Sequence, residues 1–305
     1  MPASISLSQI SWSTPEGRSL LSDLDLTFGP VRTGLVGRNG VGKSTLLRLV
    51  DGTLTPQGGK VSVVGNRGVL SQTVQVATGE TVADLFGVTD ALAVLQKADE
   101  GHASVDELAS ADWTLEARME EALARVGLDA AAQTRLAALS GGQMTRVKLA
   151  ALVFKEPDFI LLDEPTNNLD REGRAAVAAL MAGWRGGAIV VSHDRELLET
   201  MDAIVELTTL GATTYGGNWS HYRERKAIEL ASARHDLADA ERRLAEVERK
   251  TQETAERKAR KDAAGRRKRA KGDEPLLLLD RLGSARELER GLRTGVGLLR
   301  HRVAE

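Results

Sequence analysis

An eight-residue stretch, Gly37 to Ser44, constrains the fold of this chain more than any other. It reads G-x-x-x-x-G-K-S and lies between a short apolar run at residues 33–37 and a segment with helical spacing at residues 44–50. In this context glycines allow the backbone to wrap around phosphates, while loop N–H groups and the helix N-terminus carry partial positive charge. The stretch therefore predicts a strand, a phosphate-binding loop and a helix, with Lys43 reaching the β- and γ-oxygens of a nucleoside triphosphate.

A second apolar run ends in two acids. Residues 159–162 are continuously apolar and lead directly into Asp163 and Glu164. Taken alone, two solvated acids after a core strand would be the commoner explanation. Beside a phosphate loop, Asp163 is predicted to hold Mg²⁺ through water, and Ser44 to give the ion a direct oxygen ligand. Glu164 is predicted to polarise the attacking water.

The order of elements indicates an α/β fold. Residues 5–10 have the period of a strand, and the apolar runs at 33–37, 159–163 and 188–192 are typical of buried parallel strands separated by helices. Residues 81–128 lack such runs. A capping box at Ser104 and Glu107 and an apolar stripe indicate a helical subdomain there. The stripe consists of Leu115, Met119, Leu123 and Val126.

A further helix is predicted to start at residues 139–143, which read L-S-G-G-Q. Ser140 is a suitable N-cap, and the two glycines leave the helix end bare enough for an anion to approach. In isolation an ordinary capped helix explains the pattern equally well.

The chain changes character after Tyr222. Leu230, Leu237 and Leu244 recur every seven residues, each followed three positions later by Ala or Val, which indicates a coiled-coil seam on a charged helix. Residues 257–271 carry nine basic residues and one acid, so the rest of the chain has a net charge of −10. Gly265 and residues 272–275 are expected to break the helix. We place a domain boundary at 222/223, with a basic helical linker over 223–305 that suits a polyanion.

Residues 4–222 resemble the ATP-binding cassette (ABC) family. Residues 139–143 match its signature, Gln72 its Q-loop, residues 168–170 its D-loop and His193 its switch histidine, while Trp12 stands where the family stacks an aromatic ring on adenine. The resemblance implies a phosphate-loop ATPase core with antiparallel β and helical subdomains. It implies catalytic roles for Glu164, His193 and Gln72, and magnesium contacts from Ser44, Gln72 and Asp163. The expected ATP contacts are Trp12, Gly37, Asn39, Gly40, Gly42, Lys43, Ser44, Thr45, Ser140, Gly141, Gly142, Gln143 and Asp170.

The resemblance also implies partners. In the family the signature of one cassette closes over ATP held by another, so this chain, with one phosphate loop and one signature, needs a second cassette. Residues 164–170 and 215–222, followed directly by a basic helix, are similar to the ABC-F branch, whose linker reaches ribosomal RNA and tRNA. Arg266, Arg267, Lys268 and Arg269 are the expected RNA contacts. A solvated helix or a localisation-type basic cluster is the alternative on charge alone.

Two departures from the ABC-F pattern stand out. Residues 283–305 do not resemble the second linker helix, and no second cassette follows; truncation, an altered reading frame and a natural half-protein are all open. Only sixty-seven positions separate Gln72 from Leu139, which leaves no room for a large arm insertion.

Composition narrows the remaining choices. The chain has no cysteine, no secretory signal and no apolar run long enough to span a bilayer, so we expect a cytoplasmic protein without membrane insertion. We expect ATP hydrolysis with Mg²⁺ and a role on the ribosome, in translation or antibiotic resistance. The alternatives are the ATPase subunit of an ABC transporter and a DNA-binding relative, because a basic helix discriminates poorly between duplexes.

Overall fold

The computed structural model describes residues 2–70, 79–269 and 300, and for residues 265–269 the description covers the backbone alone. The chain divides into two compact units, Met1–Tyr222 and Arg223–Glu305. The strands are β1 (Ser4–Ser13), β2 (Ser19–Phe28), β3 (Arg32–Val36), β4 (Gly58–Val64), β5 (Arg67–Leu70), β6 (Phe159–Asp163), β7 (Gly187–Val191), β8 (Ala203–Thr208) and β9 (Gly211–Gly216). The helices are α1 (Lys43–Asp51), α2 (Val82–Phe86), α3 (Thr89–Asp99), α4 (Val105–Ser110), α5 (Leu115–Arg125), the 3₁₀ turn η1 (Leu136–Ala138), α6 (Gly141–Phe154), α7 (Arg171–Gly183), α8 (Arg195–Leu198) and α9 (Trp219–Arg269).

A six-stranded sheet forms the centre of the first unit, in the order β5-β6-β7-β3-β8-β9. Its first five strands are parallel, and β9 is antiparallel to β8. The predicted apolar runs are confirmed as β3, β6 and β7. Because neighbouring parallel strands end at one edge of the sheet, the loops after β3, β6 and β7 come together there.

The central sheet is buried on both faces, which explains why its strands are continuously apolar. Ile160 and Leu162 of β6 pack into a core with α2, α5, α6 and α7, while Phe159 and Leu161 pack into a second core with α1, β1 and β2. Successive side chains of a strand point to opposite faces, so each core takes every second residue.

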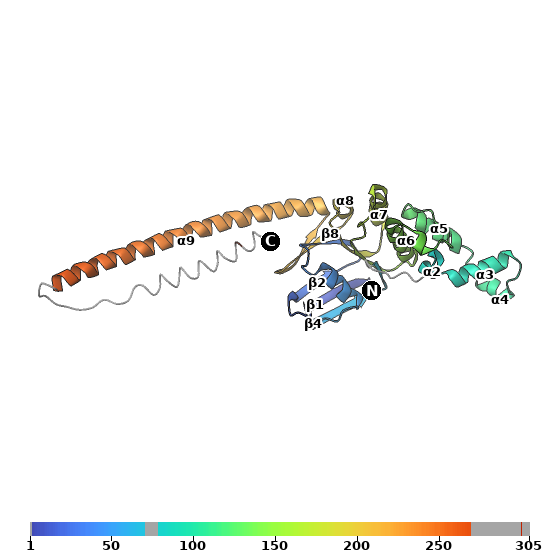
Figure 1. Cartoon of the computed structure of the whole chain (residues 1–305), viewed down its shortest axis with the longest axis horizontal. Coiled ribbons are helices and arrows are strands. Elements are labelled where there is room, and N and C mark those ends of the chain that lie inside the picture. Colours follow the sequence, from blue (N-terminus) through green and yellow to red (C-terminus); the bar gives the residue numbers. More distant parts are fainter. Residues whose placement is uncertain (1, 71–78, 270–299, 301–305) are drawn as a thin grey trace. The chain divides into compact units, whose positions relative to one another are not determined.

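The second face is covered in part by an antiparallel sheet, β2-β1-β4 (Figure 1). Residues Ile5, Leu7 and Ile10 of β1 are buried in the core that this sheet shares with α1. The family resemblance implied such an antiparallel subdomain, and the structure contains it.

The helices α2 to α5 form the predicted helical subdomain (Figure 1). Ser104 caps α4 by accepting from the Glu107 amide, and the Glu107 carboxylate accepts from the Ser104 amide, as the capping box requires. The predicted stripe is confirmed: Leu115, Met119, Leu123 and Val126 are all buried.

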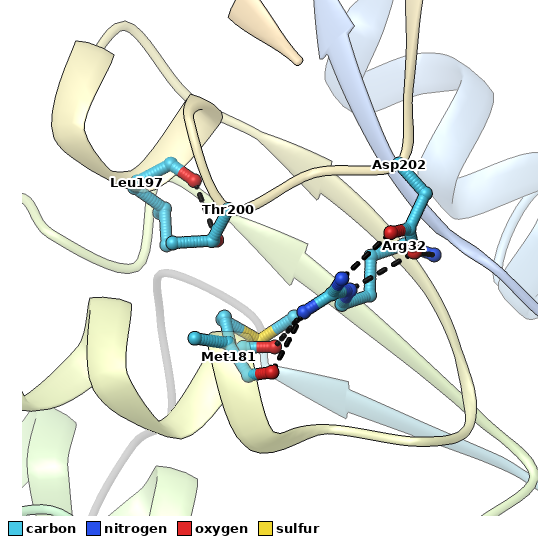
Figure 2. A network of polar contacts seen from close by, with 6 residues as sticks. Arg32, Met181, Leu197, Thr200 and Asp202 are labelled. Carbon is cyan, nitrogen blue, oxygen red and sulfur yellow. Dashed lines mark hydrogen bonds and ion pairs between the residues drawn. The ribbon is translucent and has the colours of Figure 1, made fainter. Parts of the chain in front are cut away.

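One arginine ties three parts of the first unit together, as Figure 2 shows. Arg32, at the start of β3, donates to both carboxylate oxygens of Asp202, at 2.9 Å and 2.6 Å, and to the carbonyls of Met181 and Ala182 at the end of α7. Helix ends leave carbonyls without intrahelical partners, and the planar guanidinium supplies donors for two of them here. The contacts fix α7 against the edge of the sheet where β3 begins.

The second unit contains most of α9. Most positions between the residues of the predicted seam are exposed. The seam residues themselves are buried or half-buried: Leu230, Ala233, Leu237, Ala240, Leu244 and Val247. Arg300 contacts Glu241 through Nε and a terminal nitrogen, at 2.9 Å and 2.7 Å. Coiled-coil pairing of the seam stays a prediction.

The expected helix break at Gly265 is wrong, because α9 continues to Arg269. One glycine within a helix costs about 1 kcal/mol relative to alanine, which favourable neighbours such as Ala263 and Ala264 can offset. The break predicted at residues 272–275 lies outside the described residues. Within the described ranges, no helix is both long enough and apolar enough to cross a bilayer.

Candidate nucleotide-binding site

The loop between β3 and α1 has the conformation that its glycines predict. Gly37 has a φ of 151°, and a Cβ there would lie 2.3 Å from the carbonyl oxygen of Leu207 on β8. Only glycine therefore fits where the loop leaves the sheet. Lys43 begins α1, and its Nζ donates to the carbonyls of Gly37 at 2.8 Å and Arg38 at 3.2 Å. Lys43 follows the loop in sequence, and its ammonium group folds back to contact the start of the loop.

A cavity of about 290 Å³ opens at this loop. The predicted residues that it brings together are Asn39, Gly40, Gly42, Lys43, Ser44, Thr45, Asp163 and Glu164. Residues from the end of β6 therefore face the phosphate loop, as the acidic run predicted. Leu20 of β2 also lines the cavity, and a Cβ on Gly42 would lie 3.6 Å from the Leu20 Cβ. Leu20 was not predicted, since no motif in the sequence marks it.

Asp163 has a buried carboxylate oxygen that is suited to a cation. Its Oδ1 is buried and has no hydrogen-bond partner among the described residues. Buried carboxylate oxygens normally have a hydrogen-bond or metal partner, so this oxygen is suited to bind a cation. Ser44 lines the same cavity, and a hydroxyl together with a carboxylate suits Mg²⁺, which takes most of its other ligands from phosphates and water. Gln72, the third predicted magnesium residue, lies outside the described residues.

Glu164 follows at the end of β6 in a strained conformation, with a φ of 50°. Its amide donates to the carbonyl of Val191 at 2.9 Å, which holds the turn against β7. Burial raises the pKa of its carboxyl, while His193 and Lys43 oppose that rise. A carboxylate with a raised pKa is a better proton acceptor, as a general base requires.

His193 comes from the loop after β7 and contacts residues of the loops after β3 and β6. Its Nε2 lies 3.2 Å from Asn39 Oδ1 and 3.5 Å from Glu164 Oε1. The strand order places β7 between β6 and β3, so the loop after β7 lies beside both. Burial also lowers the pKa of Lys43, against the opposing effects of Glu164 and Asp163.

The signature residues do not line this cavity. Ser140 accepts from the Gln143 amide at 3.2 Å, and the Gln143 side chain accepts from the Ser140 amide at 2.9 Å, which completes a capping box on α6. A Cβ on Gly141 would meet nothing within 4 Å, so the backbone there is open to an approaching group. Gly142 lies against the backbone of Asn168, and so the signature adjoins residues 168–170.

Two other predicted ATP contacts have local structural roles. Asp170 caps α7 by accepting from the Gly173 amide at 2.8 Å. Trp12 on β1 is half-buried against the second core and does not line the loop cavity. Their contacts with ATP stay predictions. A larger cavity of about 880 Å³ includes residues 166–169, His193 and Arg195, and Glu164 lines both cavities.

The predicted RNA contacts lie at the end of α9. Residues 266–269 are helical, but the side chains of Arg266, Arg267, Lys268 and Arg269 are outside the described part of the chain.

Several known proteins and one family profile match this chain. A family profile described as "ABC transporter" matches residues 21–167. The chain is 34% identical over 242 residues to the tylosin resistance ATP-binding protein TlrC of Streptomyces fradiae, covering 70% of this chain and 44% of that protein. It is 34% identical over 235 residues to the energy-dependent translational throttle protein EttA of Mycobacterium tuberculosis, covering 70% and 42%. Both relatives are ABC-F proteins. The chain spans less than half of their length.

Solved structures support the fold alone. The "ATP binding subunit of ABC transporter" superposes with a TM-score of 0.58 at 18% identity, covering 73% of this chain and 93% of that one. A "putative metal-chelate type ABC transporter" in an inward-facing conformation superposes with a TM-score of 0.54 at 22% identity, covering 71% and 84%.

Proposed function

This chain belongs to the ATP-binding cassette family of ATPases, and on that premise we propose that it binds and hydrolyses ATP with Mg²⁺ as one member of a cassette pair. The observation that carries the proposal is the convergence of Lys43, Ser44, Asp163 and Glu164 on one cavity beside the phosphate loop. A phosphate-binding cation, two hard oxygen ligands and a partly buried base are the groups that phosphoryl transfer to water needs.

Each residue has a distinct part. Lys43 exchanges its contacts with the loop carbonyls for the outer phosphates of ATP, while the loop amides hold the remaining oxygens. Ser44 and Asp163 would hold Mg²⁺, which neutralises phosphate charge when bound. Glu164 accepts the proton of the attacking water, and its raised pKa favours that transfer. His193 donates from Nε2 toward the terminal phosphate of the same ATP.

The position of the signature supports a pair of cassettes. Ser140 and Gly141 lie at the exposed start of α6, outside the cavity that contains Lys43. A helix N-terminus with open backbone can bind the terminal phosphate of ATP held elsewhere. We therefore assign these residues, with Gly142 and Gln143, to ATP on a second cassette, supplied by another copy or by the remainder of a longer protein.

The larger domain arrangement extends the proposal to the ribosome. We assign residues 1–222 to the cassette and 223–305 to a linker whose basic segment, 257–271, contacts RNA. Relatives named for tylosin resistance and for a translational throttle support a ribosomal role, and antibiotic resistance and translation control are its two candidate forms. Closure of two cassettes on ATP would set the linker in its binding pose, and hydrolysis would release it.

Substitution of Glu164 tests the enzymatic part. Glu164→Gln should lower turnover by about 10²- to 10⁴-fold while ATP binding survives, since only the general base is removed. Glu172→Gln, an exposed carboxylate in the first turn of α7, is the matched control and should hydrolyse ATP as wild type does. Equal turnover in Glu164→Gln and wild type would exclude Glu164 as the base.

Co-sedimentation tests the ribosomal part. The Glu164→Gln protein, incubated with ribosomes and ATP, should pellet with them, and should do so less without ATP. Replacing Arg266, Arg267, Lys268 and Arg269 should flatten the salt dependence by about 0.7 to 0.9 in log–log slope for each phosphate interaction that the substitutions remove. Retention by duplex DNA with no ribosome binding would favour a DNA-binding role instead.

A further inference from the structure

One nitrogen of His193 faces two side chains of the candidate site. Its Nε2 lies 3.2 Å from Asn39 Oδ1 and 3.5 Å from Glu164 Oε1. Asn39 belongs to the phosphate loop and Glu164 to the end of β6. The ring therefore contacts both the loop proposed to bind phosphate and the residue proposed as the general base. A neutral amide and a carboxylate therefore share the same imidazole nitrogen.

This arrangement selects one tautomer. Amide and carboxylate oxygens only accept hydrogen bonds, so a neutral His193 satisfies both neighbours only with its proton on Nε2. If the Asn39 amide were turned over, its Nδ2 would require a bare Nε2, whose lone pair would then face the Glu164 carboxylate. Two acceptors in that position repel each other. The nearby carboxylate thus favours the orientation in which Asn39 presents its oxygen.

The ring depends on these contacts because packing does not fix it. The His193 side chain is 56% exposed. Across residues 2–70, 79–269 and 300, its ring has no other hydrogen bond or ion pair. Removal of the amide would leave a half-exposed side chain free to change rotamer.

We propose that Asn39 is a positioning residue, which holds His193 with Nε2 protonated and facing the Glu164 carboxylate. The consequence for turnover rests on the proposed function, since the Nε2 proton would then face the terminal phosphate of ATP. Asn39 reaches the reaction through the histidine, in addition to lining the cavity itself. An imidazole that needs no reorientation before reaction gives the larger rate.

The tautomer can be measured in the full chain without nucleotide. Two-bond ¹H–¹⁵N spectra distinguish a protonated from a bare ring nitrogen, and His193→Gln assigns the signal among the five histidines. Wild type should show Nε2 protonated alone, and Asn39→Leu should show a mixture. Asn39→Asp, which keeps an oxygen acceptor in place, should restore the single form. A His193 spectrum unchanged in Asn39→Leu would overturn the proposal.

A double-mutant cycle supplies the second readout. Asn39→Leu should lower kcat about 10-fold, a part of the 10²- to 10⁴-fold that a positioned proton donor or acceptor contributes. In a His193→Gln background the same change should lower kcat by a smaller factor, because the part of its effect that passes through the ring is already lost. Additive effects of the two substitutions would contradict the assignment. A cassette pair with the wild-type residues that hydrolyses no ATP would refute the proposed function, while the ¹⁵N spectra would still decide the role of Asn39.

Discussion

The hydroxyl of Tyr222 donates a hydrogen bond to the carboxylate of Glu206 across 3.0 Å. Glu206 lies on β8 with 7% of its surface exposed, and Tyr215 donates to its other oxygen from 3.4 Å. Glu206 is also paired in register with Val36 on β3, the residue before the phosphate loop. The first turn of α9 and the phosphate loop are therefore both attached to β8.

Removal of this hydroxyl should destabilise the first unit. Tyr222→Phe should lower the free energy of unfolding by about 1.5 to 3 kcal/mol, the range for a hydrogen bond to a charged group. Tyr215→Phe is the matched control and should cost less, because its hydrogen bond to Glu206 is longer. Urea unfolding followed by tryptophan fluorescence measures both variants. A larger destabilisation in Tyr215→Phe would reverse our ranking of the two hydrogen bonds.

The pH dependence of turnover should report the Glu164 carboxyl. Burial raises its pKa above 4.5, and only the ionised form accepts a proton, so kcat/KM should fall as pH drops through the raised value. His193 opposes the rise, so His193→Ala should move this acid limb to higher pH. A pH–rate profile of both proteins measures the shift, and an acid limb at lower pH in the variant would contradict it.

Alanine at Gly37 should disrupt the phosphate loop. The added Cβ would lie 2.3 Å from the Leu207 carbonyl oxygen, so β8 or the loop must move. Gly40→Ala is the control: Gly40 also has a positive φ, at 78°, but its Cβ would meet nothing within 4 Å. Gly40→Ala should cost about 1 kcal/mol from backbone strain, and Gly37→Ala clearly more, with loss of ATP binding. Thermal unfolding and nucleotide titration distinguish them.

Two serines begin capping boxes, and we propose that only one of them also contributes to ATP hydrolysis. Ser140 and Ser104 each accept from an N3 amide at 3.2 Å, one on the signature helix α6 and the other on α4. Each Ser→Ala change should cost about 0.5 to 2 kcal/mol of stability. Ser140→Ala alone should also lower ATP turnover in the paired cassettes. Equal turnover in the two variants would count against a role for Ser140 at the partner's ATP.

The Arg32–Asp202 pair should make stability depend on acidity. The hydrogen bond from Arg32 lowers the pKa of Asp202, so its stabilising effect is present above the ordinary value of 3.8 and is lost as pH falls through the folded-state pKa. Arg32→Met should abolish this dependence, and at every pH should leave the Met181 and Ala182 carbonyls without these donors. Melting temperature against pH measures the effect. Arg125→Met, which breaks the exposed pair with Glu121, should change the pH dependence of the melting temperature little.

The positions of the phosphate loop, the acidic strand end and the capped helices could be predicted because their signals are local. Glycine, lysine and serine at fixed spacing have few other uses, and a capping box is contained in four residues. The continuation of α9 through Gly265 was not predicted, because a single glycine weighs little against a long run of helix-forming neighbours. Leu20 could not be found either, since nothing in its own segment marks a residue that meets Gly42 only after folding.

By itself the sequence determined the fold class, the family and the residue types of the site, because strand period, loop glycines and motif order are properties of the chain alone. The tertiary structure decided which of these residues share a cavity. The strand order β6-β7-β3 brings Glu164, His193 and Asn39 together from loops far apart in the sequence, and it leaves the Asp163 Oδ1 buried without a partner among the described residues. The tertiary structure also places Ser140 outside the cavity at the phosphate loop. Distances between distant segments are set by sheet pairing and core packing, which depend on the whole chain.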